Sequence, residues 1–211
     1  MMGLRATNSG RIRVRRSADT AKELILEAAE YFLVEHGPGG VSLRAVANRV
    51  GMTDAGVHHH FGSRDGLLEA LLARGAARLR SDLTMLTLRW QREGARITQL
   101  VEALAAFYRS GYSQLAIAVH NAGALEFEHG MLEPVVDALH AARLRRSAIP
   151  APDRRETQLA VAALHQALAL EPSCGDAFRR SAGLTSRAAS DPSAYLAWWA
   201  LTLATMLGLP K

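Results

Sequence analysis

The sequence SLRAVANRVGMTDAGVHHHFGSRDGLL, residues 42–68, predicts two short helices joined by a tight turn, then the start of a third helix. Ala47 is small where the two helices would approach, and Gly51 stands at the turn, where a positive φ is often needed. Val57 would anchor the second helix from beneath. This spacing is typical of a helix-turn-helix, whose second helix can enter a DNA major groove.

Helix-boundary signals surround this stretch. A first helix is expected from Ala18 to His36, with Thr20 and Glu23 at capping-box spacing, and the GPGG that follows should end it. Further N-caps predict the helices that follow. The predicted caps and helices are Ser42 for 43–50, Thr53 for a short helix ending near His60, and Ser63 for a long helix over 64–92.

Composition limits the class of protein. The 211 residues are 49% hydrophobic, which excludes a disordered chain. The net charge of +5 equals the charge of an N-terminal arm, residues 1–17, which we expect to be disordered. Such an arm could bind DNA phosphates or a minor groove, or it could be only a solvated tail. The arm's charges come from Arg5, Arg11, Arg13, Arg15 and Arg16.

No membrane segment or signal peptide is expected. The longest apolar run, Ala194–Leu209, has 16 residues, whereas a spanning helix needs about 20. We interpret the run as a buried interface helix. The single cysteine, Cys174 in an apparent polar loop, fits a reducing compartment and hence the cytoplasm, with a redox-sensing thiol as the less favoured alternative.

The remaining chain predicts an all-α protein of about nine helices, with no strand pattern of any length. A three-helix DNA-binding domain would cover residues 18–66, and a helical ligand-binding and dimerisation domain would cover 67–211. The expected later segments are a helix over 97–108 broken by Gly111, weaker helices over 113–128 and 131–149, a linker at 149–152, a helix over 154–170, a loop over 171–190 and a last helix over 192–209.

Residues spread over 20–68 also carry a family resemblance. They are Ile25, Ala28, Ala29, Phe32, Gly37, Val41-Ser42-Leu43, Val46-Ala47, Val50-Gly51-Met52-Thr53, Val57, His60-Phe61-Gly62-Ser63-Arg64-Asp65 and Leu67-Leu68. This pattern resembles the TetR family of bacterial transcriptional regulators. The resemblance implies a homodimer that occupies a palindromic double-stranded DNA operator, usually as a repressor, and a C-terminal domain that binds a small effector.

Three residues depart from the family pattern. His58 stands where a tyrosine that commonly touches a phosphate is usual, and it can donate the same hydrogen bond. Arg64 replaces a usual lysine and keeps its charge. Gly56 lies inside the short recognition helix at a cost of about 0.5–1 kcal/mol relative to alanine. Close approach to DNA would explain this glycine, and so would drift.

The candidate DNA contacts divide into two kinds. Helix N-termini and cationic side chains suit phosphates, and short side chains on the recognition helix suit base edges. Ser42 and Thr53 could serve simply as N-caps, a role that is compatible with phosphate binding. Asp54 could contact a base edge, or it could do no more than cap its helix. The DNA-binding candidates are Ser42, Arg44, Thr53, Asp54, Ala55, Gly56, His58, His59 and Arg64.

Two further sets of residues are predicted in the C-terminal half. An apolar or aromatic effector would pack against aromatic side chains and form polar contacts with histidines, although each of these residues could be ordinary core. The ligand-binding candidates are Trp90, Phe107, Tyr108, Tyr112, His120, Phe127, Met131 and His165. The dimer-interface candidates are Leu159, Leu164, Leu168, Tyr195, Trp198, Trp199 and Met206.

No metal or cofactor is expected. Consecutive helical residues point about 100° apart, so His58-His59-His60 cannot converge on one ion. Nothing in the chain matches a nucleophile elbow, a P-loop or a dinucleotide fingerprint, so an enzyme is not expected. The alternatives that stay open are a DNA-binding regulator without an effector, an activator, and a helical enzyme.

Overall fold

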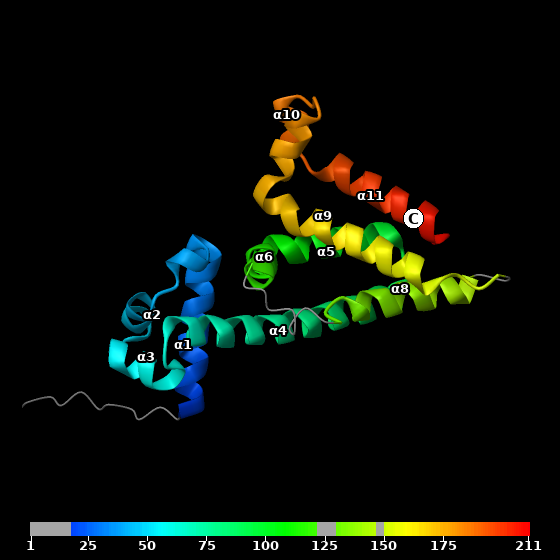
Figure 1. Cartoon of the computed structure of the whole chain (residues 1–211). Coiled ribbons are helices and arrows are strands. Elements are labelled where there is room, and N and C mark those ends of the chain that lie inside the picture. The colour runs from blue at the N-terminus through cyan, green and yellow to red at the C-terminus, as the bar shows by residue number, and fades with distance from the viewer. Residues whose placement is uncertain (1–17, 122–129, 147–149) are drawn as a thin grey trace, which may run out of the picture.

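The structure, a computed structural model, describes residues 18–121, 130–146 and 150–211. Within these ranges the chain is helical and has no strand, so the all-α prediction is confirmed (Figure 1). The elements are α1 Ala18–His36, η1 Pro38–Gly40, α2 Leu43–Val50, α3 Asp54–Phe61, α4 Arg64–Arg92, α5 Ile97–Phe107, the π-helical turn η2 Tyr108–Tyr112, α6 Ser113–Asn121, α8 Glu133–Arg146, α9 Arg154–Ser181, α10 Ser186–Ser190 and α11 Ser193–Leu207.

The predicted caps of the N-terminal helices are confirmed. The Ser42, Thr53 and Ser63 hydroxyls each accept a hydrogen bond from the backbone N–H three residues on, at 3.0–3.2 Å. Gly51 ends α2 with a φ of 71°, which a side chain would disfavour. The capping box at Thr20 is wrong, because α1 already begins at Ala18 and places Thr20 inside the helix.

The long helix α4 joins the two parts of the molecule. It begins beside α3, crosses α1 and runs away from the helix-turn-helix, with α8 alongside its far half (Figure 1). Because α4 passes unbroken through residues 66 and 67, the division of the chain into two domains at that point stays a prediction.

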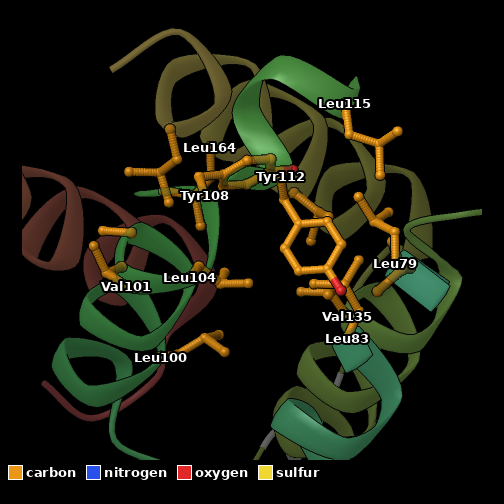
Figure 2. Packing of buried hydrophobic residues seen from close by; sticks show 14 of the residues in the cluster. Leu79, Leu83, Leu100, Val101, Leu104, Tyr108, Tyr112, Leu115, Val135 and Leu164 are labelled. Carbon is orange, nitrogen blue, oxygen red and sulfur yellow. The ribbon is translucent and has the colours of Figure 1, made fainter. Parts of the chain in front are cut away.

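The C-terminal helices enclose the main core. Figure 2 shows Leu79 and Leu83 of α4 across from Leu100 and Leu104 of α5, with Tyr112 between them. α11 packs on α5, and α9 packs on α5, α6, α8 and α11. Gly111, with a φ of 109°, makes the predicted break after α5. Among the described residues, no helix has both the length and the apolarity to cross a membrane.

The predicted loop over 171–190 is wrong. α9 continues through Pro172 to Ser181, and α10 follows after a short turn. Arg179 explains this continuation: its guanidinium donates to both Glu171 carboxylate oxygens at 2.7 Å, and its Nε donates to the Ala189 carbonyl at 2.7 Å. This ion pair is almost fully buried, so it fixes the helix on both sides of the proline.

The other C-terminal boundaries need smaller corrections. α6 and α8 lie within the two weaker helices predicted over 113–128 and 131–149, whose remaining residues fall partly outside the described ranges. The Asp153 carboxylate caps α9 by accepting from the Arg155 backbone N–H, and Glu156 in the first turn binds Arg143. Cys174 is on α9 and donates to the Leu170 carbonyl, so its predicted loop position is also wrong.

Candidate nucleic-acid interface and ligand cavity

Helix α3 is held by its inner face and exposes its outer face. Val57 is completely buried in the core. The residues on the outer face, all exposed, are Asp54, Ala55, His58 and His59. Helix α3 is therefore an eight-residue platform anchored through one apolar side chain, as the spacing predicted.

Gly56 lies where a side chain would crowd its neighbours. A Cβ at this position would lie 3.3 Å from both the Met52 Cε and the Thr53 Oγ1. The residue is only partly accessible. A side chain at this position would require the Met52 and Thr53 side chains to shift by a few tenths of an ångström, so crowding is one reason for the glycine, and close approach to DNA stays a prediction.

The two helix N-termini carry their own hydroxyls. Because Ser42 and Thr53 accept from backbone N–H groups, each keeps its O–H proton available for an acceptor such as a phosphate oxygen. Arg44 is exposed in the first turn of α2. N-capping and phosphate binding are thus compatible at these positions.

Arg64 turns toward its own domain. Its Nε donates to the Val41 carbonyl at 2.8 Å, one terminal nitrogen donates to the Pro38 carbonyl at 2.6 Å, and the other lies 3.6 Å from the Asp65 carboxylate. These bonds fasten the loop that leads into Ser42. The sequence did not reveal this structural role, and the phosphate contact of Arg64 stays a prediction.

Helix α2 exposes two residues that are not among the predicted DNA contacts. Asn48 and Arg49 are exposed, and the Arg49 guanidinium carbon lies 3.6 Å from the centre of the Tyr31 ring. The signal was present in the sequence, because Val46 and Ala47 define the buried face of α2. Residues 44 and 48, one turn apart, then fall on the outward face.

A cavity of about 290 Å³ lies between α4, α6 and α9. Three of the predicted ligand-binding residues line it: Tyr108, Met131 and His165. The other walls are mostly apolar and include Leu79 and Leu115, which Figure 2 labels with Tyr108.

Three further ligand-binding candidates do not line this cavity. The Trp90 indole N–H donates to the Arg96 carbonyl at 2.7 Å. Phe107 stacks on Tyr112 with ring centres 4.1 Å apart, and the Tyr112 hydroxyl donates to Asp82. These three residues therefore have structural contacts of their own. Phe127 and the His120 side chain lie outside the described residues.

His165 is the most unusual side chain of the cavity. Its Nδ1 lies 2.7 Å from the Tyr108 hydroxyl oxygen, and its Nε2 is buried with no hydrogen-bond partner among the described residues. Burial lowers the pKa of His165 to about 4 and raises the pKa of Tyr108 above its usual range. Both side chains are therefore uncharged at neutral pH.

The dimer candidates divide by exposure. Leu164 and Leu168 are completely buried within the chain's own core, so they are removed from the predicted interface. Their helical stripe faces inward. In contrast, Leu159, Trp198 and Met206 are 63%, 55% and 61% exposed. Tyr195 and Trp199 are half-buried beside them.

Comparison with known proteins supports the N-terminal assignment. The family model described as "Bacterial regulatory proteins, tetR family" matches residues 25–71, which run from within α1 through α2 and α3 into the start of α4. The HTH-type transcriptional regulators Rv1816 of Mycobacterium tuberculosis and Mb1846 of Mycobacterium bovis are each 40% identical over 63 residues. The aligned segment is 28% of this chain and 27% of each relative, so these likenesses concern only about a quarter of either protein.

Solved structures resemble the whole fold. A protein of unknown function from Rhodococcus sp. RHA1 gives a TM-score of 0.63 at 22% identity, over 95% of this chain and 100% of that one. A transcriptional regulator from Rhodococcus sp. Rha1 gives 0.59 at 21% identity, over 89% and 94%. None of these relatives is named as an enzyme. Residues 25–71 are thus similar in sequence to the helix-turn-helix region of the tetR family of bacterial regulatory proteins, and the whole chain shares the helical fold of the two solved structures.

Proposed function

We propose that this protein is a homodimeric transcriptional repressor that occupies a palindromic operator and leaves it when a small molecule binds. The observation that carries the proposal is α3, which is anchored by Val57 and exposes four side chains beside two capped helix N-termini. As a regulator of bacterial genes it would act in the cytoplasm.

In this proposal α3 lies in the major groove. Asp54 would accept from a cytosine amine, Ala55 would contact a thymine methyl, and His59 would face a base edge. The first turns of α2 and α3, with the Ser42 and Thr53 hydroxyls, would hold phosphates on either side. Arg44, His58 and the N-terminal arginines would add phosphate contacts.

The effector would bind the cavity beside α4. Ala76 and Leu79 of this helix line the cavity, and the same helix begins directly after α3. A molecule that moves α4 would therefore move the recognition helix. This connection supports release by an effector over a regulator that binds DNA alone.

The partner in the dimer would be a second copy seated on α9 and α11. Exposed apolar side chains concentrate on these helices, which is uncommon on a monomer's surface. They include Leu159, Phe178, Trp198, Leu201 and Met206. Two such helix pairs could form a four-helix bundle about a two-fold axis.

The DNA proposal is tested with an operator selected by the full chain from a random DNA pool. Arg44→Ala should weaken binding of this operator and reduce the salt dependence by about one phosphate contact. Arg145→Ala removes the same charge from the exposed last turn of α8, outside the proposed dimer interface, and should leave binding unchanged. Equal affinities for the two variants, or no enriched DNA sequence, would contradict the proposal.

A further inference from the structure

Building on the proposed effector function, we infer that the cavity beside His165 takes an uncharged, largely apolar molecule with one acceptor oxygen, which the His165 Nε2–H binds. The inference joins two observations: His165 lines the cavity, and its buried Nε2 has no hydrogen-bond partner among the residues that the structure describes.

The Tyr108–His165 hydrogen bond decides which atom of the imidazole carries the proton. If Tyr108 donates to Nδ1, the tyrosine proton is satisfied and the imidazole proton resides on Nε2. If Nδ1 donated instead, the tyrosine proton and Nε2 would both lack partners among the described residues. The first arrangement leaves one buried group unsatisfied rather than two. Nε2 is therefore a donor.

The chemistry of the walls decides the charge of the ligand. The described residues that line the cavity include no Asp, Glu, Lys or Arg. Apart from Tyr108 and His165, their one polar side chain is Gln166. Because burial keeps His165 neutral, neither a carboxylate nor an ammonium group would find a counter-charge on these walls.

The size and geometry limit the ligand further. A volume of about 290 Å³ lies near the lower end of the range for small-molecule pockets. A ketone, ester, amide or ether oxygen would satisfy the N–H, and an apolar body would contact Leu79, Leu115 and Met131. A hydrocarbon of the same shape would leave the N–H unsatisfied, so the site discriminates against it.

Three matched probes test this inference on the full-length protein. Acetophenone carries a carbonyl, α-methylstyrene replaces that oxygen by a CH2 group, and benzoate replaces the methyl group by a charged oxygen. We expect acetophenone to bind roughly tenfold more tightly than α-methylstyrene, in line with one satisfied hydrogen bond. Benzoate should bind more weakly than acetophenone.

Nitrogen-15 NMR of the histidine side chains shows directly which ring nitrogen of His165 carries the proton. His165 should show the Nε2–H tautomer at pH 7, and acetophenone should shift its Nε2 resonance in a saturable manner. The Nδ1–H tautomer, no saturable acetophenone binding, equal affinity for the styrene, or tighter binding of benzoate would each overturn the inference.

Variants assign the preference to one side chain. His165→Leu should abolish the preference for acetophenone over α-methylstyrene, whereas Gln166→Leu, on the same wall, should retain it. If His165→Leu does not fold, Tyr108→Phe serves instead, because Nδ1 loses its donor and the NMR spectrum should then show a reduced Nε2–H fraction. An unchanged preference in His165→Leu, or an unchanged tautomer in Tyr108→Phe, would contradict the inference.

Measuring DNA binding and probe binding on the same protein distinguishes a failure of this inference from a failure of the proposed function. DNA binding without any carbonyl preference in the cavity rejects the ligand assignment and leaves the DNA-binding proposal standing. A carbonyl preference that leaves operator affinity unchanged supports the ligand assignment and rejects release by an effector.

Discussion

At the residue scale, single atoms decide how the α3–α4 junction closes. Gly66 lies in the first turn of α4, and a Cβ there would lie 2.3 Å from the Phe61 carbonyl oxygen. That oxygen belongs to backbone and cannot move aside like the end of a side chain. Gly66 therefore permits the close turn that sets α4 against the recognition helix.

Gly66→Ala should consequently destabilise the protein by about 1–3 kcal/mol, as overpacking does in well-packed sites. Thermal unfolding followed by circular dichroism measures the loss. Gly39→Ala is the matched control, because its Cβ would have no neighbour within 4 Å. Equal melting temperatures for the two variants would show that the backbone contact has no energetic weight.

His165 should also make stability depend on pH. Its pKa is lowered from 6.5 to about 4 in the folded protein, so between these values the unfolded chain binds the proton and the folded protein does not. Stability should be complete above about pH 6.5 and fall as the pH drops toward 4, by up to about 1.4 kcal/mol per pH unit from this group.

Urea unfolding at a series of pH values checks this expectation. His165→Leu should flatten the decline between pH 6.5 and 4, and a substitution of the exposed His36 by glutamine should not. The same decline in wild type and His165→Leu would mean that His165 is not the group responsible.

At the element scale, local signals in the sequence correctly predicted where α2, α3 and α4 begin. Ser42, Thr53 and Ser63 cap their helices through backbone groups three residues away, so the information lies within each short segment. The burial of Val57 followed from spacing alone. These features predicted the platform of α3, although which DNA bases it would read is not encoded in them.

The C-terminal half of α9 could not be predicted from local signals in the sequence. Pro172 and Gly175 are local signals against a helix, but the Glu171–Arg179 ion pair and its bond to Ala189 outweigh them. A Cβ on Gly175 would collide with the Glu171 carboxylate, so the glycine makes room for the pair. Contacts between residues eight and more positions apart cannot be recognised from the local pattern.

Breaking this pair by Arg179→Leu should cost about 3–5 kcal/mol, because the Glu171 carboxylate would stay buried without a partner. The double variant Glu171→Leu/Arg179→Leu should be more stable than the single variant, since no charge is then stranded. Hydrogen exchange of the amides in 171–181 gives the local measure. A double variant less stable than Arg179→Leu would refute this account.

At the scale of the whole molecule, the periodicity of α9 predicted an apolar face but not what covers it. Leu164 and Leu168 are covered by the chain itself, whereas Leu159 on the same helix is exposed. Arg64 likewise could not be assigned from its charge, because its partners in the 38–41 segment are set by the three-dimensional fold. Burial within one chain and burial between two chains look alike in a sequence.

The proposed dimer gives a prediction at this scale. Trp198→Glu combined with Met206→Glu should shift the protein to a monomer, because two charges would be buried in an apolar interface. Sedimentation velocity measures the change. Leu144→Glu, at an exposed leucine of α8, is the control and should leave the assembly unchanged. A dimer that survives the double substitution would place the interface elsewhere.

The unbroken course of α4 has a mechanical consequence. Gly75 allows the Leu115 side chain to lie directly against this helix, so α6 bears on it at a point about 17 Å from its first residue at 1.5 Å per residue. A tilt of about 5° around that point would carry the start of α4 through roughly 1.5 Å. The helix thus acts as a lever arm. A change at Leu115 that is too small to disturb the core would move the α3 end of this helix by about half the length of a hydrogen bond.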